Sequence, residues 1–344
     1  MQYGLMQGNI RLREQIAEWV AHEANRPTAK QSADEILITT GSGPALSVIC
    51  HLFSKPGDTI FVDSPGYFLA YYTFKDCDLQ VVDIPTDEFG MDVDAMEEQL
   101  RSGVRPSLVY TVPIANNPTG VSMSEERKER LLELSREYGF KIAADEVYQF
   151  LTWNSKFPTS LYEFDDPHNP TVFSINSFSK ILGPGLRLGW VTSNQTHIAR
   201  ILDYGALHSG GGFNPFASAI VSEMIDNGEV DKQVTRLRDH YSTTSEALCE
   251  ALEQYVRPAL RDGETLHYYK PMGGFFCFVQ LPDRINADEL LAAAKQHGAS
   301  FFAGKYFSQD REGFQNCIRL CFAFVSTEEI QEGVRRIGEA IKGL

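Results

Sequence analysis

Two basic residues lie close together in one short segment, SINSFSKILGPGLRLGW, which spans residues 174–190. Lys180 follows two serines, Ser177 and Ser179, and Arg187 precedes a run that is typical of a strand. A lysine amine can attack a carbonyl carbon, and an arginine guanidinium can bind a phosphate or carboxylate through two parallel hydrogen bonds. The segment therefore combines a nucleophile with groups that bind an anion.

Strand-like runs alternate with helical patterns through the first 200 residues. The runs are short, apolar on both faces and rich in β-branched residues, which is typical of strands covered by helices on both sides. They span residues 36–40, 59–63, 79–85, 108–112, 141–145, 171–175 and 188–192. One intervening helix is expected to begin after Ser124 and to end at Gly139. The pattern predicts an α/β fold in which a large domain, residues 1–215, contains a mostly parallel seven-stranded sheet.

The pattern changes in the last third of the chain. A long, interrupted helical stretch (215–256) precedes a strand at 275–281, a helix that begins near Ala287, a strand at 316–324 and a closing amphipathic helix. These elements predict a smaller α+β C-terminal domain, residues 216–344, which includes the long linking helix.

Polar and glycine-containing segments repeatedly follow the predicted strands of the large domain. They are GSG (41–43), SPGY (64–67), NNPTG (116–120), Asp145 and SFSK (177–180). Ligands of open α/β sheets bind beyond the carboxyl ends of the strands, so we expect these five segments to form one site.

An anion is expected to bind in part of this site. GSGPAL places small residues between a strand and a helix, where backbone N–H groups and the Ser42 hydroxyl can surround a phosphate. Ser177 and Arg187 can bind the same group. Together with Lys180, Asp145 and Tyr67, these residues predict that the chain holds pyridoxal 5'-phosphate as a Schiff base. Lys180 would supply the amine, Asp145 would keep the ring nitrogen of the cofactor protonated, and the flat side chain of Tyr67 would lie over the ring.

Composition excludes other classes of ligand. The net charge of −15 argues against nucleic acid or an anionic membrane as a partner. No apolar run reaches the length of a membrane span, and the N-terminal sequence does not resemble a signal peptide, so a cytoplasmic location is expected. The six cysteines are scattered and indicate buried free thiols, and no metal site is expected because neither CxxC nor HExxH is present.

The motifs, in their order, resemble those of class I/II aminotransferases of fold type I, which depend on pyridoxal phosphate. The resemblance covers nearly the whole chain. It rests on YG (3–4), QGNIRLREQIA (7–17), GSGPAL (41–46), DSPGY (63–67), NNPTG (116–120), DEVY (145–148), SFSKILGPGLRLGW (177–190), GGFF (273–276) and IRLCFA (318–323). The spacing from SFSK to PGLRLGW is similar to that of the group that acts on aromatic amino acids, kynurenine and 2-aminoadipate.

The resemblance implies a role for each matching residue. Lys180 would form the Schiff base, Asp145 would pair with the pyridine nitrogen and Tyr67 would stack on the ring. Asn117 and Tyr148 would bind the phenolic oxygen, and Arg319, together with Asn117, would contact the substrate carboxylate. The phosphate would be held by Ser42, Gly43, Ser177, Arg187 and, from the other subunit of a homodimer with composite sites, Tyr3.

The resemblance also implies the reaction, which is transfer of an amino group between an L-α-amino acid and a 2-oxo acid, with 2-oxoglutarate as an expected acceptor. Elimination or replacement at the β or γ carbon, as in carbon-sulfur lyases or aminocyclopropane-carboxylate synthases of this fold, is the alternative, because the motifs hold the cofactor and do not select the bond that breaks. A nicotinamide-binding fold, with Asp63 as its acidic residue, and a regulator's effector domain are weaker alternatives.

Four finer expectations concern single features. Only Met1 and Gln2 precede Tyr3, whereas family members normally carry an N-terminal arm there, so we expect either that the arm is missing from this chain or that the site is more open than usual. The glycines of HSGGGFNPFA (208–217) predict extra room or mobility. Glu146 is interpreted as the start of a helix. Tyr67 and Tyr148, taken without the other motifs, fit core aromatics equally well.

Overall fold

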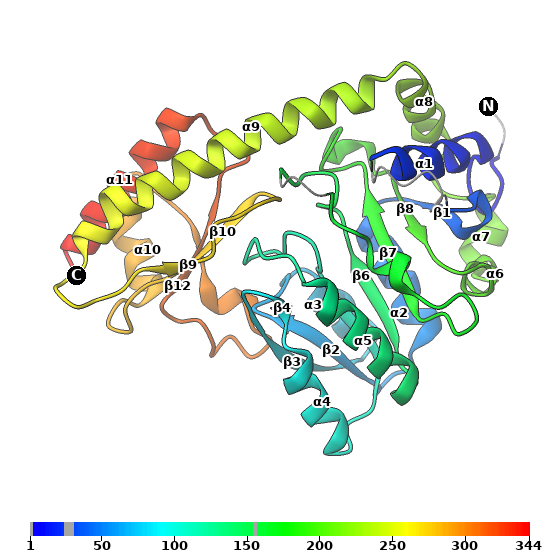
Figure 1. Ribbon diagram of the computed structural model, residues 1–344, viewed down its shortest axis with the longest axis horizontal. Coiled ribbons are helices and arrows are strands. Elements are labelled where there is room, and N and C mark those ends of the chain that lie inside the picture. The colour runs from blue at the N-terminus through cyan, green and yellow to red at the C-terminus, as the bar shows by residue number, and fades with distance from the viewer. Residues whose placement is uncertain (1–2, 24–30, 154–156) are drawn as a thin grey trace.

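The computed structural model describes residues 3–23, 31–153 and 157–344. Within these residues the chain forms a large lobe around one sheet and a smaller lobe around a second sheet (Figure 1). The large-lobe strands are β1 (Ile36–Thr39), β2 (Thr59–Ser64), β3 (Gln80–Asp87), β4 (Gly90–Met91), β5 (Pro106–Thr111), β6 (Lys141–Asp145), β7 (Val172–Ser177) and β8 (Gly189–Thr192).

The large sheet has the strand order β1-β8-β7-β6-β5-β2-β3-β4. The pairs β3–β2, β2–β5, β5–β6 and β6–β7 are parallel, whereas β8 runs antiparallel to both β7 and β1. All seven predicted strands are present, so the mostly parallel arrangement is confirmed. Among the described residues the sheet has eight strands rather than seven, because the two-residue β4 folds back on β3 as a hairpin.

Both faces of the large sheet are buried, as the apolar runs predict. Along β2, Ile60 and Val62 pack into one apolar cluster while Phe61 between them packs into the other, because side chains alternate along a strand. The helices of this lobe are α1 (Ile10–Glu23), α2 (Ser42–Phe53), α3 (Ala70–Asp76), α4 (Val93–Arg101), α5 (Glu125–Tyr138), α6 (Gln195–Leu202), α7 (Gly205–Gly210) and α8 (Pro215–Asp226). Short 3₁₀ turns are η1 (Ala33–Glu35), η2 (Leu161–Phe164) and η3 (Pro184–Leu186).

Local sequence sets the helix ends. Ser124 caps α5 by accepting a hydrogen bond from the backbone N–H of Arg127, and Gly139 ends that helix in the left-handed region at φ 80°, as predicted. Ser326 and Glu329 form a capping box at the start of the last helix.

The small lobe contains a second, antiparallel sheet. Its strand order is β11-β12-β10-β9, from β9 (His267–Tyr268), β10 (Phe276–Gln280), β11 (Phe302–Ala303) and β12 (Cys317–Cys321). It is covered by α10 (Ala287–Gln296) and α11 (Thr327–Lys342), and η6 (Gly304–Phe307) follows β11. The sequence pattern revealed β10 and β12 but not the two-residue strands β9 and β11, since pairs of residues are too short to show a period.

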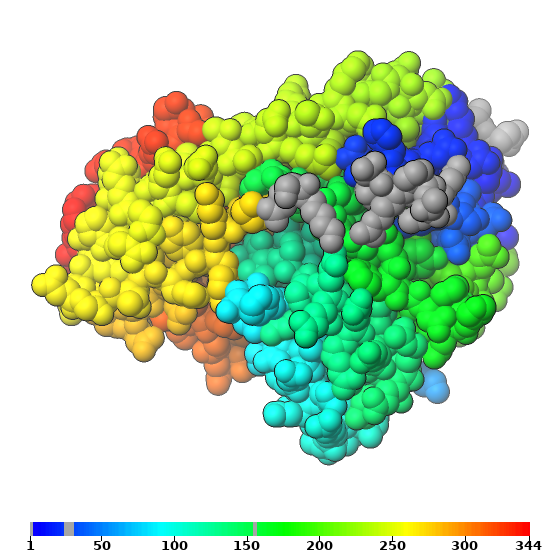
Figure 2. Space-filling view, in the orientation of Figure 1, coloured from blue at the N-terminus to red at the C-terminus, as the bar shows by residue number. Residues whose placement is uncertain are grey.

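A long helix joins the two lobes. α9 (Glu229–Ala251) continues through a π-helical turn, η4 (Leu252–Val256), into the 3₁₀ turn η5 (Arg257–Ala259). Figure 1 shows α9 running from α8 beside the large lobe to α11 in the small lobe, and in Figure 2 the same segment forms a continuous band along the upper edge of the molecule. The predicted domain boundary at residue 215 falls at the start of α8, which packs on α1 of the large lobe, and the division itself stays a prediction.

None of the helices in the described part of the chain is both long and apolar enough to cross a membrane.

Candidate active site

Lys180 and Asp145 lie at the carboxyl ends of neighbouring strands. Asp145 is the last residue of β6, and Lys180 lies in the turn that follows β7. Phe178, two residues before the lysine, is fully buried and packs 4.9 Å from the Trp190 ring, which anchors this turn to the sheet. The sheet topology therefore brings the predicted amine and the predicted acid to one edge.

The Asp145 carboxyl group is buried, and one of its two oxygens has a hydrogen-bond partner. Its Oδ2 accepts a hydrogen bond from the Tyr110 hydroxyl at 2.9 Å, while Oδ1 has no hydrogen-bond partner among the described residues. Burial raises the pKa of Asp145 to about 6, against the opposing effects of the Tyr110 bond and the nearby charge of Lys180. A buried oxygen of this kind fits a cationic N–H donor from a ligand.

The Lys180 amine lies against two aromatic rings. Its Nζ is 6.0 Å from the Tyr148 ring centroid and 5.9 Å from that of Phe275. Burial lowers the pKa of Lys180, and the Asp145 charge partly offsets this effect. A lowered pKa increases the neutral, nucleophilic fraction of the amine.

The predicted phosphate-binding residues meet at the start of α2. Ser42 is the first residue of this helix, and a methyl group built on Gly43 would meet no atom within 4 Å, so space is open beside these two residues. The Arg187 guanidinium reaches the same place, since its Nη2 donates to the Thr40 carbonyl oxygen at 3.4 Å. The free N–H groups at a helix N-terminus and a neighbouring guanidinium can together bind a phosphate.

Two hydroxyl groups lie beside this site. Ser177 is buried and donates to the Leu188 carbonyl oxygen, whereas the buried Ser179 Oγ has no hydrogen-bond partner within the described residues. The sequence analysis did not predict Ser179 as a site residue. Its position between Ser177 and Lys180 was the feature of the sequence that could have indicated it.

Arg319 is a buried cation in the middle of strand β12. Its Nη1 donates to Asn117 Oδ1 at 2.9 Å, its Nε has no partner among the described residues, and burial lowers its pKa. Three aromatic rings surround its Cζ, with centroids at 4.0 Å (Phe276), 4.6 Å (Phe302) and 5.2 Å (Phe307). No ion pair to Arg319 is found in the described part of the chain, so this buried guanidinium can accept a ligand carboxylate as its partner.

Asn117 is delivered by a loop that a buried carboxylate holds in place. Asp63 accepts hydrogen bonds from the Thr111 hydroxyl, the Val112 N–H and the Asn116 side chain, and burial raises its pKa to about 7. Asp63 is therefore enclosed behind the loop and is not available to bind a ribose. This finding contradicts the nicotinamide-binding alternative.

Tyr67 and Tyr148 complete the site. Tyr148 is buried, with its ring edge-on to Phe275 at 5.2 Å between centroids. Tyr67 is half-buried; burial, followed by the charge of Asp145, raises its pKa, while Arg319 and Arg187 act in the opposite direction. The charges of Asp145 and Arg319 thus act on both tyrosines, and the Tyr148 ring lies beside the Lys180 amine.

Comparison with known proteins identifies the family. The model of the family "Aminotransferase class I and II" matches residues 1–337. The chain belongs to the class I and II aminotransferases. It is a pyridoxal-phosphate-dependent aminotransferase, and transamination is supported over elimination or replacement.

Its relatives carry names from one group of aminotransferases. An aromatic-amino-acid aminotransferase from Thermococcus litoralis is 34% identical over 99% of this chain and 80% of its own length. A kynurenine aminotransferase from Pyrococcus horikoshii has a TM-score of 0.90 at 33% identity, covering 100% of this chain and 82% of that one. An α-aminoadipate aminotransferase from Thermus thermophilus, solved with a phosphopyridoxyl-leucine adduct, has a TM-score of 0.86 at 30% identity, covering 99% and 83%.

The residues of this aminotransferase fit the cofactor of its family. The unpartnered Asp145 Oδ1 suits a pyridine N–H, the open space at Gly43 suits a phosphate, and the half-buried Lys180 amine suits a bond to the aldehyde. In contrast, residues 3–23, 31–153 and 157–344 contain no group of three or more His, Cys, Asp or Glu side chains that could hold a metal ion.

Tyr3 is not part of this constellation within one aminotransferase chain. Its side chain is 83% exposed, and it lies beside Gly211. A methyl group on Gly211 would lie 2.8 Å from the Gly4 carbonyl oxygen, and one on Gly212 would lie 2.0 Å from the Leu5 carbonyl oxygen. The expected extra room is therefore absent at these two glycines, because they let the N-terminal segment pack closely, whereas a methyl group on Gly210 would meet no atom within 4 Å. The expected mobility stays a prediction.

Two further expectations, the helix start at Glu146 and the burial of all six cysteines, need correction. Glu146 does not start a helix; it is buried and accepts hydrogen bonds from Ser160, Ser174 and the Leu161 N–H. All six cysteines are free thiols, but Cys321 is exposed and Cys77 is only half-buried. The buried thiol prediction thus holds for the other four.

Proposed function

We propose that this aminotransferase moves an amino group between an L-α-amino acid and a 2-oxo acid in the pocket between Lys180 and Arg319. The buried, otherwise unpaired Arg319 guanidinium carries this proposal, because both substrate classes have a carboxylate next to the reacting carbon. A bidentate pair with that carboxylate would orient the carbon toward Lys180.

The cofactor would be held by the residues at the carboxyl edge of the sheet. Asp145 would bind the pyridine nitrogen through its free Oδ1, and Tyr67 would lie over the ring. Ser42, the Gly43 N–H, Ser177 and Arg187 would bind the phosphate, and the unpartnered hydroxyl of Ser179 supports a place for it there too. When bound, the cofactor supplies an aldehyde that joins to amines and a protonated ring that accepts electrons.

Lys180 would carry out the proton transfers. Its Nζ would hold the cofactor through a Schiff base at rest and, once the substrate amine has displaced it, would move the proton at the substrate Cα. Tyr148 and Asn117 would hydrogen-bond the phenolic oxygen of the cofactor. Asn117 would at the same time keep Arg319 oriented toward the substrate, since the two side chains are hydrogen-bonded.

We also infer a homodimer. Exposed apolar side chains gather where the N-terminal segment meets α8, and they include Tyr3, Leu5, Ile10, Phe216 and Ile220. A partner subunit that covers this surface would shield it from water and would bring Tyr3 to the partner's phosphate site. Light scattering at micromolar protein concentration tests whether the chain is a dimer. A comparison of cofactor affinity between the wild type and Tyr3→Phe tests whether Tyr3 reaches the partner's phosphate site.

The names of the relatives support aromatic amino acids, kynurenine and 2-aminoadipate as substrates to test first. 2-Oxoglutarate as the acceptor stays a prediction. A cytoplasmic location also stays a prediction. The decisive experiment follows the absorption band of the bound cofactor through panels of L-amino acids and then 2-oxo acids. Loss of the band with an amino acid and its return with a 2-oxo acid would support the proposal, whereas release of ammonia or of a side-chain fragment would contradict it.

A further inference from the structure

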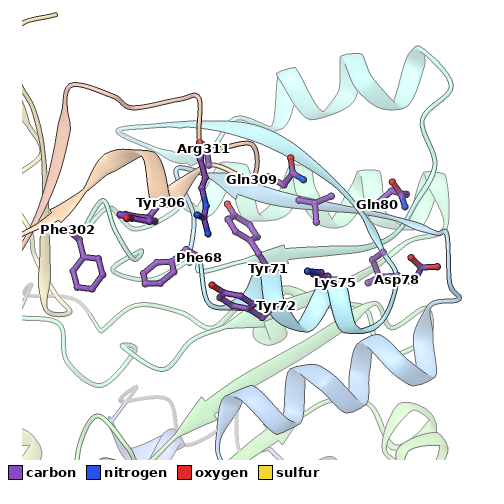
Figure 3. Close-up of a pocket in the computed structure, with 13 residues that line it drawn as sticks. Phe68, Tyr71, Tyr72, Lys75, Asp78, Gln80, Phe302, Tyr306, Gln309 and Arg311 are labelled. Carbon is purple, nitrogen blue, oxygen red and sulfur yellow. The ribbon is translucent and has the colours of Figure 1, made fainter. Parts of the chain in front are cut away.

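A second cavity lies between the two lobes, beside the active site rather than within it. Its volume is about 580 Å³, which is in the range of small-molecule sites. One wall comes from Phe68, α3 and the start of β3, and the other from β11, η6 and the segment that follows to Arg311 (Figure 3). Neither Lys180 nor Arg319 lines it.

Aromatic rings form much of the cavity wall. Phe68 lies 5.7 Å from Phe302 and 6.5 Å from Tyr306, measured between ring centroids, so rings from the two lobes meet here. Tyr72 and Phe302 remain 58% and 46% exposed. A flat ligand placed between these rings would remove apolar surface from water, and aromatic rings favour such contacts.

Two cations at this cavity have no ion pair among the described residues. Arg311 and Lys75 are both exposed, and Figure 3 shows the Arg311 side chain reaching in between Tyr306 and Tyr71, with Lys75 toward the other end. The Arg311 Cζ lies 5.4 Å from the Tyr306 ring centroid, and its backbone has φ 62°, in the left-handed region that a non-glycine residue rarely adopts. By comparison, the neighbouring Lys305 pairs with Asp288.

The cavity carries charges of both signs. Lys75, Arg311 and Asp78 line it. Burial, followed by the nearby charges of Asp83, Asp63 and Asp310, raises the pKa of Tyr71, which also lines it. Because the protein has a net charge of −15, an anion that binds here must be held by a local cation.

We propose that this cavity is a second ligand site that binds a small aromatic carboxylate, with its ring among Phe68, Tyr72 and Tyr306 and its carboxylate on Arg311, while Lys75 attracts the anion from the other end. The site is separate from the Arg319 carboxylate site, although one ring contacts both. Phe302 lies over the Arg319 guanidinium and also lines the cavity. A bound ligand would therefore contact a side chain that covers the catalytic carboxylate site.

Isothermal titration calorimetry of the cofactor-loaded enzyme with phenylacetate tests this site, because phenylacetate has neither an amino nor an oxo group to react. We expect binding that weakens at least tenfold in Lys75→Ala/Arg311→Ala. Both side chains are exposed, so this variant should fold normally. Lys232→Ala/Arg236→Ala is the matched control, since it removes two exposed cations from α9, and it should bind as the wild type does.

A second measurement locates the ligand. Crystals soaked in 4-bromophenylacetate should give an anomalous bromine peak among Phe68, Tyr72 and Tyr306. Phenylacetate affinity that is equal in the wild type and in Lys75→Ala/Arg311→Ala would overturn the proposal, because any binding would then belong to Arg319. Absence of binding to the wild type at millimolar concentration, or equal affinity for the uncharged 2-phenylethanol, would overturn it as well.

Discussion

Asn117 and Arg319 share a hydrogen bond of 2.9 Å although 202 positions separate them in the chain. Asn117 comes from the loop after β5 in the large lobe, and Arg319 comes from the middle of β12 in the small lobe. The bond thus joins the two lobes at the point where substrate and cofactor are proposed to meet. It also leaves the remaining guanidinium donors free for a carboxylate.

Replacing Arg319 with lysine should raise KM for the amino acid substrate by about 10- to 100-fold, because an ammonium cannot form the paired hydrogen bonds of a guanidinium. The absorption band of the bound cofactor should not change, since Arg319 is not proposed to contact the cofactor. Steady-state kinetics and cofactor titration measure the two effects, with the exposed Arg257→Lys as control. An unchanged KM would remove Arg319 from substrate binding.

Lys180→Ala should lower turnover by at least about 10³-fold, because the chain would lose both the amine that holds the cofactor and the group that moves the Cα proton. Borohydride reduction followed by mass spectrometry should show one covalently attached cofactor in the wild type and none in the variant. The exposed Lys295→Ala on α10 should retain both activity and attachment. Cofactor found attached to Lys180→Ala would contradict the assignment.

Asp145→Asn should stabilise the cofactor-free protein at pH 8 while weakening cofactor binding. The folded-state pKa of Asp145, about 6, lies above its ordinary value of 3.8, so the folded state binds the extra proton between these values. Stability of the wild type should therefore fall as pH rises from about 4 to about 6 and then level off. The asparagine variant lacks this penalty, which is at most about 3 kcal/mol.

Urea unfolding at pH 5 and pH 8 measures this difference, and cofactor titration measures the loss of binding. Equal stability of Asp145→Asn and the wild type at pH 8 would mean that the carboxylate is adequately solvated in the folded state.

Gly212→Ala should destabilise the fold by about 2–4 kcal/mol, because Gly212 has φ 91° and an added methyl group would lie 2.0 Å from the Leu5 carbonyl oxygen. Gly210→Ala is the matched control, since a methyl group there meets no atom within 4 Å and the residue ends helix α7. Thermal unfolding compares the two variants. If they unfold at the same temperature, the N-terminal segment is not held against these glycines in solution.

The large sheet could be predicted because its longer strands each have a recognisable local sequence pattern. Most of its longer strands are apolar on both faces, and Ser124 and Gly139 mark a helix between two of them. The two-residue strands β4, β9 and β11 could not be predicted, because they form only when a neighbouring strand offers its hydrogen-bonding edge. Glu146 was misread for a similar reason, since its partners Ser160 and Ser174 lie on other segments.

The sequence by itself determined which residues we propose to bind the cofactor of this aminotransferase, because Ser42, Asp145, Lys180 and Arg187 each lie in a short motif at a strand end, and strand ends meet at one edge of such a sheet. Only the tertiary structure decided how the lobes meet. The Asn117–Arg319 bond, the packing of Gly212 against Leu5 and the aromatic cavity all depend on contacts between distant segments. Such contacts form through the burial and pairing of groups from different elements, which no local pattern of residues records.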